Sequence, residues 1–213
     1  MFNTSVEAEV NSVARFVLSA PGILLALTVH EVAHGWVAYI LGDPTAKRAG
    51  RLTFNPLAHL DILGTIMLFL VHFGWARPVP VDPYNLRNPK RDMIWISLAG
   101  PGANILTAFV LTRLMRLLTG IWLPGPLLYL LSFGMYINLI LAFFNLIPVH
   151  PLDGEKVLVG LLPLGPAYRF AQLERYGPLI LIVVLLFDQM VFPVVRGTVG
   201  LLSSYLGRWM MSF

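Results

Sequence analysis

Two histidines and a glutamate lie close together in an apolar stretch near the start of the chain. The sequence His30-Glu31-Val32-Ala33-His34 has the pattern H-E-x-x-H. On a helix, a spacing of four residues puts both imidazoles on one face, where they can bind the same ion with the glutamate beside them. The pattern therefore predicts a zinc centre in which His30 and His34 are ligands and Glu31 is the catalytic base.

Such a centre would catalyse hydrolysis. Zinc with three protein ligands keeps one position for a water whose pKa falls to about 7, and Glu31 would take the proton of that water. A short motif also arises by chance. Here three ionisable side chains interrupt an apolar span, where they are costly unless they serve a function. We therefore favour the zinc site, one ion per chain.

The composition places this site in a membrane protein. The chain has 213 residues, of which 57% are hydrophobic and 12% charged, far from the balance of a soluble domain. The basic residues form no run with interleaved aromatics, which excludes nucleic acid as an expected partner. The absence of cysteine restricts metal ligands to nitrogen and oxygen. We expect one integral membrane domain over residues 1–213.

The apolar segments predict the helices that position the site. We expect an all-α polytopic membrane protein with about four to six membrane helices, one of them short and re-entrant, and small membrane-associated β-strands. Residues 62–73 are too few to cross a ~30 Å core and form the re-entrant segment. The long helices are expected at residues 13–41, 93–118, 127–147 and 177–195.

Two loop segments have strand-like character. A β-like piece is expected at residues 51–54, and the alternating prolines Pro78 and Pro80 allow an edge strand at residues 76–81 but forbid a central one. With residues 62–73 re-entrant, the loops 42–61, 74–91 and 148–176 share one side. These loops hold ten of the 15 Lys and Arg residues. The positive-inside bias therefore predicts that they lie on the cytoplasmic side of the cell membrane.

A second motif follows the third long apolar segment. The stretch from Asn145 to Gly154 contains Pro148, Pro151 and Asp153 in the pattern N-x-x-P-x-x-P-L-D-G. Together with the first motif it resembles the site-2 protease family of intramembrane zinc metalloproteases, in the compact subgroup without a PDZ domain. The similarity extends through residues 42–46, 50–53, 55–59 and 99–101.

The resemblance implies that Asp153 is the third zinc ligand. A carboxylate beside two neutral imidazoles also reduces the net charge of the site in a poorly solvated interior. Without the histidine motif, Asp153 before Gly154 would be read as a turn residue. The resemblance further implies that Asn104 and Asn145 bind the oxyanion or the substrate backbone, and the alternative is bonding between helices.

Several other polar residues have open roles. His59 and His72 are more typical of structural histidines, and His59 is expected to stabilise its loop. His150 is either an alternative ligand or a pH-sensitive neighbour of Asp153. Asp188 and residues 197–213 are left without an assigned role.

The main functional hypothesis is an intramembrane endopeptidase. Its substrate would be a single-pass membrane protein, which must unwind locally because helical carbonyls are already hydrogen-bonded. Residues 76–81 would receive the unwound segment by edge pairing. The alternative is a non-catalytic membrane scaffold that retains the protease fold, and a metallohydrolase acting on lipid ranks last. The intact Glu31 weighs against a scaffold.

Overall fold

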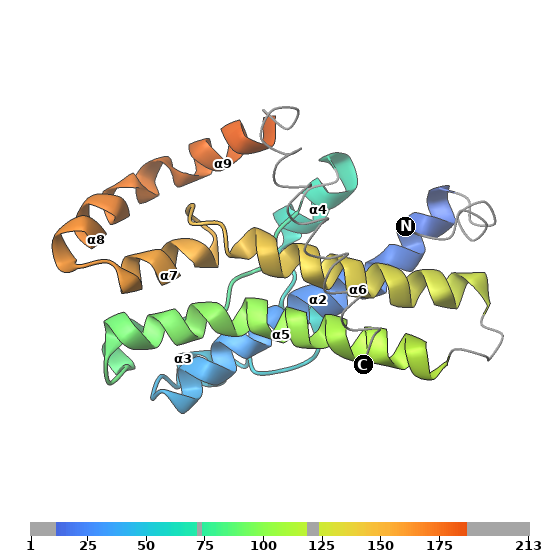
Figure 1. Ribbon diagram of the computed structural model, residues 1–213, viewed down its shortest axis with the longest axis horizontal. Coiled ribbons are helices and arrows are strands. Elements are labelled where there is room, and N and C mark those ends of the chain that lie inside the picture. The colour runs from blue at the N-terminus through green and yellow to red at the C-terminus, as the bar shows by residue number, and fades with distance from the viewer. Residues whose placement is uncertain (1–11, 72–73, 119–123, 187–213) are drawn as a thin grey trace.

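The computed structural model describes residues 12–71, 74–118 and 124–186, and within them the protein is helical (Figure 1). Among these residues, three helices are long and apolar enough to cross a membrane: α2 (Ser12–Ile40), α5 (Pro89–Leu117) and α6 (Gly125–Asn145). They agree with three of the four predicted long helices. The fourth, at residues 177–195, is described only as α9 (Gly177–Leu186), and Asp188 lies outside the described residues.

The three long helices pack together as a bundle in which the chain direction alternates (Figure 1). Small residues allow α2 and α6 to approach closely. A methyl group on Gly22 would lie 3.3 Å from the Cα of Gly134. The interior of the bundle is unusually polar, because Asn104, Asn138 and Thr112 are fully buried alongside Leu139. Buried amides must find hydrogen-bond partners, so these side chains specify how the helices dock.

The segment expected to be re-entrant forms the short helix α4 (Ile62–Val71). Ten residues of α-helix span about 15 Å, which is half of the hydrocarbon core. Both α2 and α4 precede α5, and α5 begins at the end of the bundle where α2 finishes (Figure 1). The loops between α2 and α5 and the loop after α6 therefore emerge together at that end.

The predicted strands are wrong for the described residues. Residues 51–54 and 76–81 contain no strand, and the β-type pairing found is an isolated antiparallel bridge between Leu60 and Ala76. The prolines of residues 76–81 permit extended backbone, but a strand also needs a neighbour with which to form a ladder. Such a partner for residues 77–81 is missing from the part of the chain that the structure describes.

The predicted loop 148–176 contains more helix than expected. It folds into α7 (Asp153–Leu161), α8 (Leu164–Ala171) and the 3₁₀ segment η3 (Gln172–Tyr176), which lead into α9. Shorter pieces precede α5, namely α3 (Thr45–Arg48), η1 (Pro56–Ala58) and η2 (Pro83–Asn85). Helix α7 packs against α5, and this contact brings its first residue, Asp153, towards the bundle.

Candidate metal centre

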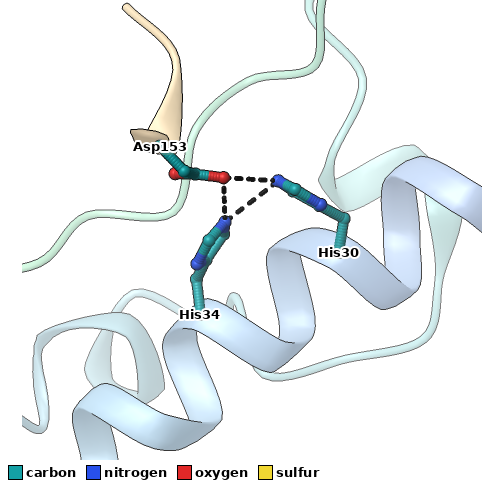
Figure 2. A group of neighbouring side chains, drawn as sticks. All are labelled: His30, His34 and Asp153. Carbon is teal, nitrogen blue, oxygen red and sulfur yellow. Dashed lines mark hydrogen bonds and ion pairs between the residues drawn. The ribbon is translucent and has the colours of Figure 1, made fainter. Parts of the chain in front are cut away.

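The structure brings together the two histidines of α2 and the first residue of α7. His30 and His34 lie one turn apart on α2 and present their Nε2 atoms to each other at 3.0 Å. The Oδ2 atom of Asp153 lies 3.1 Å from Nε2 of His30 and 3.2 Å from Nε2 of His34. Figure 2 shows the three side chains pointing at one another. All three residues are buried.

The protons of the two imidazoles are assigned by their other contacts. Nδ1 of His34 lies 2.6 Å from the carbonyl oxygen of Ile96 and can only donate to it. Nδ1 of His30 lies 2.6 Å from Oδ1 of Asn104. With both Nδ1 atoms protonated, a neutral imidazole carries its lone pair on Nε2. Three lone-pair atoms thus meet within a triangle whose edges are 3.0–3.2 Å.

This triangle fits a zinc ion. Tetrahedral zinc with bonds of about 2.0–2.1 Å separates its ligand atoms by about 3.3 Å. Oδ2 of Asp153 is buried and has no hydrogen-bond partner, although two imidazole nitrogens lie within 3.2 Å of it. Such an arrangement is costly unless a cation lies between the lone pairs. His30, His34 and Asp153 could therefore hold a metal ion.

Helix α5 covers the site with a glycine. A Cβ atom added to Gly100 would lie 2.4 Å from Nε2 of His34 and 2.7 Å from Cε1 of His30. Distances below 3.0 Å are not tolerated by real Cβ atoms, so a side chain at this position would displace the imidazoles. The role of Gly100 was not evident from the sequence beyond its place in the Ala-Gly-Pro stretch.

Asn104 supports His30 from behind. Its Nδ2 donates to the carbonyl oxygen of Ala26 at 2.9 Å and to Oδ1 of Asn138 at 2.8 Å. Both amide protons are therefore used within the bundle, and none is left for an oxyanion in this arrangement. Asn138, which no sequence motif identified, accepts a hydrogen bond from Asn104 and orients its amide. An asparagine inside an apolar helix was the signal that could have identified it.

Glu31 contacts the loop segment that precedes α5. Its Oε2 accepts a hydrogen bond of 2.8 Å from the backbone N–H of Val79. The buried Arg51 donates to the carbonyl oxygen of Arg77 in the same segment. Burial and the nearby charge of Arg77 lower the pKa of Arg51, while Glu31 opposes this shift. Residues 76–81 are thus held beside the motif of α2.

Asp153 is poised to remain ionised. Burial by itself would raise the pKa of this carboxyl group, because the charged form loses its hydration. When His30 and His34 are protonated and donate to it, their hydrogen bonds and positive charge outweigh burial and hold the pKa of Asp153 well below its ordinary value. An ionised carboxylate is the form that a metal ligand requires.

The remaining candidates lie elsewhere. Asn145 donates to the carbonyl oxygen of Leu141 in its own helix at 2.9 Å. His59 donates from Nε2 to the carbonyl oxygen of Thr53 at 2.8 Å, which confirms its expected role in the loop. His150 faces Glu155 and Glu174 instead of the two histidines of α2. His72 and residues 197–213 lie outside the described residues.

Comparison with known proteins supports a hydrolytic zinc site. The model of peptidase family M50 matches residues 120–186, a range that includes Asp153. The chain is 38% identical to the Bacillus subtilis protein named "Putative zinc metalloprotease YwhC", over 76% of each chain. It is 29% identical to "Putative zinc metalloprotease Rip2" of Mycolicibacterium smegmatis, over 80% of this chain and 67% of that protein. No solved structure matches the chain significantly.

Proposed function

The chain belongs to peptidase family M50, the site-2 protease family of membrane zinc metalloproteases, and from that premise we propose that it is an intramembrane endopeptidase. Its substrate class is the transmembrane segment of a single-pass membrane protein. The observation that carries the proposal is the convergence of two imidazole nitrogens and one carboxylate oxygen on α2 and α7. Zinc is the cofactor, and we propose that His30, His34 and Asp153 hold one ion.

Each residue then has a distinct chemical task. Zinc, when bound, lowers the pKa of a coordinated water to about 7 and polarises the scissile carbonyl. Glu31 is the proposed general base. Its Oε2 is held by the N–H of Val79, which leaves Oε1 to accept the proton of the water and later to give it to the leaving amine.

Residues 76–81 offer a place for the substrate backbone. The N–H of Arg77 donates to the carbonyl of His59, and the N–H of Val79 is used by Glu31. Pro78 and Pro80 have no N–H, and their carbonyls have no hydrogen-bond partner among the described residues. These carbonyls are acceptors for an unwound substrate, which would thereby lie next to the catalytic glutamate.

The proposed topology puts the site inside the bilayer with access from one face. His34 precedes the end of α2 by six residues, which is about 9 Å of helix. The loops 42–61, 74–91 and 148–176 leave the bundle at that same end and carry most of the basic residues. We propose that this end is cytoplasmic, in agreement with the positive-inside bias.

The test compares the native chain with Glu31→Gln. Both are reconstituted in liposomes with a panel of tagged single-pass proteins, and the fragments are identified by mass spectrometry. Loss of a general base lowers a rate by about 10²–10⁴, whereas zinc content, measured by elemental mass spectrometry, should stay unchanged. Asp153→Ala should lose both zinc and cleavage.

The rival functions give different results in the same experiment. A scaffold would yield no fragments with any panel member, and Glu31→Gln would then preserve its cellular effect. A lipid hydrolase would release products from protein-free vesicles. Equal cleavage by the native chain and Glu31→Gln would overturn the assigned role of Glu31.

A further inference from the structure

A second cluster of metal-ligating side chains lies beside the start of α7. Nδ1 of His150 is 3.5 Å from Oε2 of Glu155 and 3.6 Å from Oε1 of Glu174. Glu155 belongs to α7, and Glu174 lies in η3 just before α9. One ligand atom from each of the three residues lies within 4.8 Å of the other two. The cluster shares no residue with the centre formed by His30, His34 and Asp153.

The three side chains are not joined by hydrogen bonds. Nδ1 of His150 is buried and has no hydrogen-bond partner, although two carboxylate oxygens lie within 3.6 Å. The same signature marks the first centre, where Oδ2 of Asp153 is buried without a partner between two imidazoles. Ligand atoms that converge without bonding to one another leave a place for a cation between them.

Among the described residues, no lysine or arginine balances the negative charge of the cluster. The side chain of Glu155 is 10% exposed, and no lysine or arginine pairs with Glu155 or Glu174 within the described ranges. A buried carboxylate is costly unless it is paired or binds a metal. A neutral imidazole does not supply the missing positive charge, but a divalent cation would.

The surroundings provide room for an ion and its water ligands. A cavity of about 170 Å³ opens at the cluster, lined by His150, Glu155, Glu174 and apolar residues. A water molecule takes about 30 Å³, so the cavity accommodates an ion with several waters. The side chain of Glu174 is 58% exposed, which gives the cavity access to solvent. The backbone of Gly177 packs closely against His150 at one side of this cavity, because a Cβ at Gly177 would lie 2.4 Å from Cβ of His150.

We propose that His150, Glu155 and Glu174 form a second, non-catalytic site for a divalent transition-metal ion. One imidazole and two carboxylates suit zinc or manganese. Calcium prefers oxygen ligands alone, and soft metal ions prefer thiolate ligands. A bound ion would connect η3, through Glu174, to the segment around Asp153, through His150 and Glu155. The protein then binds two ions, one in each cluster.

The test is equilibrium dialysis of the full chain in detergent against a series of free zinc concentrations. Bound zinc per chain is measured by elemental mass spectrometry. The native chain should saturate at two equivalents, whereas Glu174→Gln and His150→Gln should each saturate at one. Asp82→Asn, an acidic residue in neither cluster, is the matched control and should keep two.

Asp153→Ala separates this proposal from the proposed catalytic site. It should retain one equivalent, which disappears when Glu174→Gln is added. Two equivalents retained by both Glu174→Gln and His150→Gln would overturn the second site. Saturation of the native chain at one equivalent that Asp153→Ala removes would also overturn it, while the catalytic site would stand. Two equivalents retained by Asp153→Ala would instead contradict the catalytic assignment.

Discussion

Asn104 accepts a hydrogen bond from His30 at 2.6 Å, on the side of the imidazole opposite to Asp153. Asn104 can act as the acceptor because its own N–H groups are donated to Ala26 and Asn138. The contact therefore fixes the proton on Nδ1 and leaves the lone pair of Nε2 directed at Asp153. A histidine ligand oriented in this way keeps its tautomer without the metal, which lowers the cost of binding the ion.

Asn104→Ala should weaken zinc binding by about 10–100-fold, the range expected when the partner of a histidine ligand is lost. The measurement is competition with a chelator of known affinity. Asn145→Ala is the matched control, because its amide donates to the carbonyl of Leu141 in its own helix. Zinc affinity that is unchanged in Asn104→Ala, or reduced equally in Asn145→Ala, would contradict the supporting role of Asn104.

Gly100→Ala should remove zinc while leaving the bundle folded. The added methyl group would lie 2.4 Å from Nε2 of His34, although alanine is a better helix former than glycine by about 1 kcal/mol. Gly102→Ala provides the control on the same helix, because its added Cβ meets no atom within 4 Å apart from its chain neighbours and the backbone of its own helix. Zinc content and thermal unfolding in detergent are measured for both. Equal zinc content in the two variants would show that α5 does not cover the site.

Asp43 is expected to make the stability of the protein depend on pH. It is fully buried between α2 and the loop before α5. Burial would raise its pKa, but the hydroxyl of Thr45, the N–H of Asp82 and the side chain of Asn85 donate to it and lower the pKa below its ordinary value. The contribution of ionised Asp43 to the free energy of unfolding is fully present at pH values above its pKa in the unfolded chain, about 3.9. This contribution is lost as the pH falls through the lower pKa that Asp43 has in the folded protein.

Asp43→Asn should therefore reduce stability by about 1–3 kcal/mol at pH 7, and the difference from the native chain should shrink as the pH falls below about 4. Unfolding temperatures of both chains are compared at pH 7 and pH 3. Taking the difference cancels the acid titration of the metal ligands, which both chains share. A difference that grows at low pH would mean that the hydrogen bonds to Asp43 do not stabilise its charged form.

Pairing of the substrate with residues 76–81 can be tested without altering the protein. Pro78 and Pro80 supply carbonyl acceptors without N–H donors, so a substrate must donate its own N–H groups. Methylation of single backbone nitrogens in a cleaved synthetic peptide should abolish cleavage at alternate positions near the scissile bond, as in strand pairing. Competition binding to Glu31→Gln should weaken at the same positions. The same loss of cleavage at every methylated position would argue against this pairing.

Patterns of neighbouring residues predict the local features of this protein. A spacing of four residues places His30 and His34 on one face of a helix, because helical geometry is set by neighbouring residues. The long apolar segments similarly predicted α2, α5 and α6, and the shortness of residues 62–73 predicted the short α4. Asp153 required the resemblance to a family, because an aspartate before a glycine is also typical of a turn.

Features that depend on residues far apart in the chain follow only from how the helices pack. The prolines near residue 79 indicated extended backbone, but a strand needs a partner that the local sequence does not encode. Asn104 was expected either to bind the oxyanion or the substrate backbone or to bond between helices, and only the packing of α2, α5 and α6 brings its amide into contact with His30, Ala26 and Asn138. The grouping of His150 with Glu174 likewise follows from the fold of α7, α8 and η3, because long-range contacts are set by helix packing and not by spacing.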